Sequence, residues 1–62
     1  MYRKTVLEKN GAQRITVITD DNGTQVFDEN GTAIATYGDD RHDEAVKNYT
    51  DGGWTIVSDE KR

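Results

Sequence analysis

Hydrophobic and polar residues alternate along the first 37 positions, in four short runs rich in Val, Ile and Thr. Such alternation predicts β-strands that bury one face, and we place them at residues 2–8, 13–19, 24–28 and 32–37. Asn-Gly pairs at 10–11, 22–23 and 30–31 separate the runs. Because Asn and Gly tolerate the positive φ angles of two-residue hairpin turns, the sequence predicts a four-stranded antiparallel meander.

The pattern changes after residue 38. Residues 39–50 begin with acids and then place Ala45, Val46 and Tyr49 at helical spacing, which predicts a helix with Asp39 or Asp40 as its N-cap. Gly52-Gly53 ends this helix, and residues 54–58 have the composition of a fifth strand. The order ββββαβ predicts one small α+β domain over residues 1–62. We favour the strand order 5-1-2-3-4, with every pair antiparallel; a fifth strand beside the fourth would instead need a right-handed parallel crossover.

Two-residue turns also fix which residues face each other. They place Val6 opposite Ile15, and Lys4 opposite Val17. They place Ile18 opposite Phe27, and Thr19 opposite Val26. In the last hairpin they place Phe27 opposite Ile34, and Val26 opposite Ala35. We expect the helix to pack on the face with more apolar residues, completed by Trp54 and Ile56: Tyr2, Val6, Ile15, Val17, Val26, Ala33, Ala35 and Tyr37.

The opposite face is expected to keep an apolar patch of Ile18, Phe27 and Ile34, with Arg3 beside it. An exposed apolar patch rimmed by polar groups is typical of an interaction site. The alternative is that sheet twist curls this face around a second small core.

Charge has a direction in this arrangement. The chain carries 8 Lys plus Arg against 12 Asp plus Glu, a formal net charge of −4. The second turn and the start of the helix should share one end of the molecule, which would gather six carboxylates for electrostatic docking: Asp20, Asp21, Asp39, Asp40, Asp43 and Glu44. Such a surface suits a basic, often nucleic-acid-binding, protein partner. Ordinary turn and helix-cap chemistry is the alternative explanation.

Composition excludes several other functions. With no cysteine there is no disulfide framework and no thiolate metal site, and we expect neither a metal nor a cofactor. The only histidine, His42, falls in the first helical turn, where we expect a solvated or capping role and no catalysis. Direct nucleic-acid binding is disfavoured by the negative charge. No apolar run is long enough for a membrane span and none resembles a signal peptide, so we expect a cytoplasmic protein.

The sequence therefore favours a non-enzymatic acidic protein-binding module. One form would be a virus- or mobile-element-encoded inhibitor that blocks a host nucleic-acid-binding protein as a nucleic-acid mimic. The main alternative is a homodimer that buries the Ile18, Phe27 and Ile34 patch. An enzyme or metal site around His42, Asp39 and Asp43 is a third hypothesis, and an idealised mini-protein with regular turns is a fourth.

Overall fold

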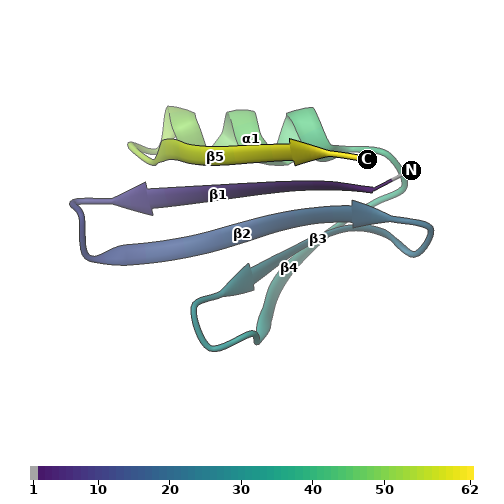
Figure 1. Cartoon of the computed structure of the whole chain (residues 1–62), viewed down its shortest axis with the longest axis horizontal. Helices are drawn as coiled ribbons and strands as arrows, with labels where there is room; N and C mark the ends of the chain where they lie inside the picture. Colours follow the sequence, from purple (N-terminus) through teal and green to yellow (C-terminus); the bar gives the residue numbers. More distant parts are fainter. Residues whose placement is uncertain (1) are drawn as a thin grey trace.

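A computed structural model describes residues 2–62 as one five-stranded antiparallel sheet with a single helix (Figure 1). The strands are β1 (Arg3–Lys9), β2 (Gln13–Asp20), β3 (Gly23–Asp28), β4 (Ala33–Gly38) and β5 (Thr55–Lys61), and the helix is α1 (His42–Asp51). The order across the sheet is β4-β3-β2-β1-β5, which confirms the predicted α+β meander. Because β5 returns beside β1, Tyr2 and Arg62 lie together, with backbone N–H···O distances of 3.4 and 2.9 Å between them.

The first hairpin differs from the prediction by one residue. Lys9 pairs with Gln13, so three residues form the connection, and Leu7 rather than Val6 faces Ile15. The predicted pairs of Val6 with Ile15 and Lys4 with Val17 are therefore wrong. Side chains alternate along a strand, so one extra loop residue turns every β1 side chain to the other face of the sheet.

The second hairpin is shifted by two residues. Asp20 faces Gly23, and Val17 faces Val26, so the predicted pairs of Ile18 with Phe27 and Thr19 with Val26 are also wrong. An even shift preserves the faces, however, and Val17 and Val26 still lie on the same side. The turn begins one residue early because the Asp20 carboxylate accepts a hydrogen bond from the backbone of Asn22 at 2.8 Å.

The third hairpin is predicted in part. Val26 faces Ala35 as expected, but Phe27 faces Ala33 instead of Ile34 because a bulge interrupts the ladder. In the turn, the Asp28 carboxylate accepts hydrogen bonds from the backbone of Asn30 and of Thr32, both at 2.9 Å.

The core lies between α1 and the sheet. Its buried apolar side chains are Leu7, Ile15, Val17, Val26 and Ala45, with Ala35, Tyr37, Val46, Tyr49 and Trp54 packed around them. Four members of the predicted set are corrected. Tyr2 and Val6 are only half-buried and lie outside the core, because β1 presents Leu7 to the helix, and Ala33 and Ile56 are exposed. Helix α1 packs on β2 and β3, so the edge strand β5 receives little cover, and Ile56 stays 47% exposed.

The helix begins three residues later than predicted. Its N-cap is Arg41, which makes no side-chain capping hydrogen bond, and neither Asp39 nor Asp40 caps it. Gly38 and Asp40 both adopt positive φ angles, 83° and 51°, so the chain turns there before the helix can start. The predicted end at Gly52-Gly53 is confirmed by backbone bonds to the last turn. Within residues 2–62 no helix has the length and apolar character needed to cross a membrane.

Candidate functional site

The fold brings the predicted carboxylates to one end of the molecule. We call this surface the acidic end: Asp20, Asp21, Asp39, Asp40, Asp43 and Glu44. The β2–β3 turn and the segment between β4 and α1 meet there (Figure 1). Four of the six carboxylates line one shallow hollow: Asp20, Asp21, Asp39 and Asp40. Asp39 and Asp40 also border a neighbouring hollow, where they are joined by Asp43 and Glu44 of α1.

Basic side chains compensate only part of this charge. Arg3 reaches Asp43 at 2.6 Å and Asp59 at 3.1 Å, and Arg41 pairs with Glu44 at 3.0 Å. The hydrogen bond to Asp59 raises the pKa of Arg3, and the same bond lowers the pKa of Asp59. Among residues 2–62, no basic side chain pairs with Asp39 or Asp40. The charge of the acidic end is therefore only partly compensated within residues 2–62, and Asp39 and Asp40 between β4 and α1 are among its unpaired carboxylates.

Arg3 lies on the helix side of the sheet. Its partners Asp43 and Asp59 belong to α1 and β5, and its side chain is only 18% exposed. The sequence interpretation had placed Arg3 beside Ile18 on the opposite face. The changed register of β1 accounts for the difference, because it moves Arg3, Thr5 and Leu7 together to the core side.

Next to the acidic end the structure contains a buried polar network that sequence reasoning missed. His42 is 3% exposed, and both of its ring nitrogens are hydrogen-bonded to threonine hydroxyls. Nε2 lies 2.7 Å from Thr5 Oγ1, and Nδ1 lies 2.8 Å from Thr19 Oγ1. We call the following set the His42 network: Thr5, Thr19, Thr24, the Arg41 main chain, His42 and Asp59.

The network continues on both sides of the imidazole. Thr5 donates its hydroxyl hydrogen to Asp59 at 2.8 Å. On the other side, Thr19 contacts Thr24 at 2.7 Å, and the backbone N–H of Arg41 donates to Thr24 at 3.1 Å. No buried side-chain nitrogen or oxygen in residues 2–62 lacks a hydrogen-bond partner. The expectation that His42 is solvated or capping is therefore wrong.

The sequence did contain a signal for this network. His42, Ala45, Val46 and Tyr49 follow the i, i+3, i+4, i+7 pattern of one helix face, which places the imidazole toward the sheet. Thr19 alternates with Val17, and Thr24 with Val26, so both hydroxyls continue the core face. Thr5 joins them only through the three-residue first loop, which the Asn-Gly pair did not reveal.

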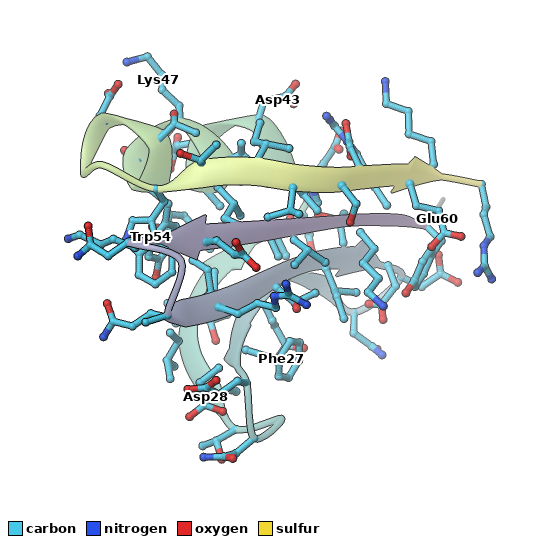
Figure 2. The ribbon with its side chains drawn as sticks, turned by 60° about the vertical axis from the view of Figure 1, so that its left-hand side comes forward. Phe27, Asp28, Asp43, Lys47, Trp54 and Glu60 are labelled. Carbon is cyan, nitrogen blue, oxygen red and sulfur yellow. The ribbon has the colours of Figure 1, made fainter. Side chains whose placement is uncertain are left out.

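The sheet face opposite α1, which we call the open face, carries the predicted apolar patch in reduced form. Ile18 and Phe27 are half-buried and line a shallow hollow together with Lys4, Arg14, Thr16, Asp28, Glu29 and Gly31. Ile34 does not border this hollow and is 50% exposed. Ile18 faces Gln25, so Phe27 is its diagonal neighbour on the next strand. Figure 2 shows Phe27 well away from Asp43 and Lys47 of the helix.

The proposed catalytic or metal use of His42 finds no support in this geometry. Its two ring nitrogens are occupied by Thr5 and Thr19, and almost none of the ring reaches solvent. Over residues 2–62, no three His, Cys, Asp or Glu side chains are grouped so that they could hold a metal ion.

Comparison with protein-family models, with curated proteins and with solved structures finds no match for this chain.

Proposed function

We propose that this chain is a non-enzymatic, cytoplasmic protein-binding module whose acidic end docks on a basic protein surface. The observation that carries the proposal is the shared hollow of Asp20, Asp21, Asp39 and Asp40, which come from two separate segments of the chain. Turn chemistry explains the carboxylate of Asp20, which accepts a backbone hydrogen bond in its own turn. It also accounts for Asp40, whose φ of 51° an aspartate tolerates. It does not account for Asp39, which neither caps the helix nor pairs with a basic residue among residues 2–62.

A partner of this kind would present Lys or Arg side chains that ordinarily meet phosphates. Clustered carboxylates attract such a surface over distances of about 10 Å at 0.1 M salt and accelerate association. Occupying the basic surface would exclude nucleic acid from it. We therefore propose inhibition of a nucleic-acid-binding protein as the specific role, with a virus or mobile element as the natural source of such an inhibitor.

The matched variants Asp39→Lys and Asp51→Lys test this proposal. Both substitutions change the net charge equally, but Asp51 ends α1, about 15 Å along the helix axis from its start. Binding is measured against a panel of purified basic DNA-binding proteins, with labelled duplex DNA as competitor. We expect the unmodified chain to displace DNA from at least one of them. We expect Asp39→Lys to slow association about tenfold at low salt, as loss of electrostatic steering requires, and Asp51→Lys to have little effect.

Two results would contradict the proposal. One is the failure of the unmodified chain to displace DNA from any protein in the panel. The other is an equal loss of binding in both variants, because that would indicate a response to net charge rather than to the acidic end.

The open face favours a second candidate function, a homodimer. Lys4 faces Ile18 across the β1–β2 ladder, Phe27 lies diagonally beyond Ile18, and Glu29 directly follows β3. The hollow thus has Lys4 at one end of a diagonal, an apolar floor and Glu29 at the other end, where Arg14 is paired with Glu8. A two-fold axis through its centre would place Lys4 of each copy near Glu29 of the other, which is the self-complementarity that a two-fold dimer needs.

Sedimentation at several protein concentrations tests the dimer. We expect Phe27→Asp, Lys4→Glu and Glu29→Lys each to shift the chain toward the monomer, because each removes one part of the diagonal. The combined Lys4→Glu and Glu29→Lys variant restores opposite charges and should recover association. A chain that stays monomeric at hundreds of micromolar would refute the dimer and leave the acidic end unaffected.

A further inference from the structure

The hydrogen bonds of the His42 network fix the position of every proton in it. Thr5 has one hydroxyl hydrogen and donates it to Asp59, so the contact of 2.7 Å with His42 requires Nε2–H as donor. In a neutral imidazole the other nitrogen, Nδ1, is then an acceptor, and Thr19 must donate to it. The tautomer of His42 therefore follows from its partners.

Donors and acceptors are also fixed at Thr19 and Thr24, on the other side of the imidazole. The hydrogen of Thr19 is used on His42, so the contact of 2.7 Å with Thr24 requires Thr24 as donor. Thr24 in turn accepts from the backbone N–H of Arg41. All donors consequently point in one direction, from Arg41 at the start of α1 through the imidazole to the carboxylate of Asp59 on β5.

A second proton on His42 has no place in this arrangement. Protonated Nδ1 would donate to Thr19, and the chain on that side would have to reverse. The last hydroxyl hydrogen would then lie on Thr19 or Thr24 with no acceptor, although both residues are buried. Leaving a buried polar group without a hydrogen-bond partner destabilises the fold.

The charges around the imidazole also oppose the added proton. Arg3 of β1 and Lys61 of β5 disfavour a positive ring, whereas Asp59 of β5 and Asp43 of α1 favour it. Arg3 is itself paired with both of these carboxylates. Strands β2 and β3 contribute the uncharged Thr19 and Thr24. The charged residues Asp39, Asp40, Arg41 and Glu44 line the same hollow as His42. Burial, followed by Arg3, lowers the pKa of His42 below its ordinary value of 6.5.

We infer that neutral His42 latches α1 onto the sheet, and that uptake of one proton at His42 releases the helix. The latch joins the first residue of α1 to β1 through Thr5 and to β2 through Thr19. Releasing α1 would uncover the core side chains that only the helix shields, among them Val17 and Val26. This inference concerns the fold itself and does not depend on the acidic end having a partner.

The sign of the pH effect follows from linkage. The unfolded chain binds the proton near pH 6.5, and the folded chain binds it only at lower pH. Stability is therefore fully present above about pH 6.5 and falls as the pH drops below it, until the folded-state pKa is reached. In that window the open form binds more protons than the closed form, so the opening constant of α1 rises as the pH falls, by at most about tenfold per pH unit.

Nuclear magnetic resonance on the unmodified chain tests both the tautomer of His42 and the pH-dependent opening of α1. Because His42 is the only histidine, its ring nitrogens give one set of signals. At pH 7 we expect the neutral Nε2–H tautomer. Hydrogen exchange of the Ala45 and Val46 amides, corrected for its intrinsic pH dependence, should show an opening constant that rises as the pH falls below 6.5. A charged ring or an Nδ1–H tautomer at pH 7, or an opening constant that is flat between pH 7 and 5, would overturn the latch.

The variant His42→Gln separates the latch from general acid sensitivity. Its amide N–H can still donate toward Thr5 but cannot be protonated in this range, so the opening constant of α1 should be independent of pH between 7 and 5. A pH dependence equal to that of the unmodified chain would refute the assignment to His42. Should this variant fail to fold, the tautomer and the exchange slope of the unmodified chain still decide the question.

Discussion

At the scale of single residues, threonines carry much of the specificity of this fold. Thr5, Thr19 and Thr24 are buried, and composition alone counts them as strand formers. The hydroxyls of Thr5 and Thr19 bind the imidazole of His42, which the sequence predicts to be solvated or capping, and Thr24 supports Thr19. The helical spacing of His42 with Ala45 was readable, but the acceptor and donor roles were not, because they depend on which residues the folded sheet brings together.

Asp59 gives a residue-scale prediction about acid. Its pKa is lowered by the hydrogen bond from Arg3 and then by the one from Thr5, so its contribution to stability exists above the unfolded value of 3.8 and is lost as pH falls through the folded value. This loss lies below the window of His42. We expect Asp59→Asn to lower the free energy of unfolding at pH 7 by about 1 kcal/mol in urea unfolding. This value lies between the usual contribution of an exposed ion pair and that of a hydrogen bond to a charged group. Below pH 4 the stability of the variant should depend less on pH than that of the unmodified chain.

Glu60→Gln is the matched control for Asp59, because among residues 2–62 Glu60 forms an ion pair only with exposed Arg62. Its stability curve below pH 4 should follow that of the unmodified chain. An acid response of Asp59→Asn as steep as that of the control would show that the contacts of Asp59 with Arg3 and Thr5 do not stabilise the fold.

At the scale of elements, strand order was predictable and register was not. Three turn signals, alternating strands and one amphipathic segment are enough to predict a meander with one covered face. The side chains that fill that face depend on loop lengths, and an Asn-Gly pair fits both a two-residue and a three-residue connection. Because the first loop has one residue more than predicted, Leu7 rather than Val6 lies in the core. For the same reason Arg3 lies on the helix side, where it pairs with Asp43 and Asp59, and not on the open face.

The variants Leu7→Ala and Val6→Ala test the register of β1. Leu7 is fully buried, so its truncation should cost about 2–5 kcal/mol. Val6 is half-buried outside the core, and its truncation should cost about 1 kcal/mol or less. Urea unfolding monitored by the single tryptophan, Trp54, measures both values, because its ring packs edge-on against Tyr49 of α1 at 5.9 Å. A larger loss for Val6→Ala would indicate the two-residue turn.

At the scale of the whole molecule, one helix is all that shields a sheet of five strands. At this chain length only about 60% of the unfolded surface is buried, so stability is expected to be small. The asymmetry was predictable from composition, because a single amphipathic segment can cover a single face. The size of the remaining apolar surface was not predictable from composition. The bulge in the last hairpin separates Ile34 from the hollow that Ile18 and Phe27 line.

The adjacency of Tyr2 and Arg62 has a practical consequence. Both ends of the described chain emerge at the side of the molecule where the β2–β3 turn and the start of α1 lie (Figure 1). An affinity tag or fusion partner attached at either terminus would crowd the carboxylates that we propose to engage a partner. Fluorophores and immobilisation chemistry belong instead in the β1–β2 turn, at the opposite end of the molecule, where Ala12 is exposed.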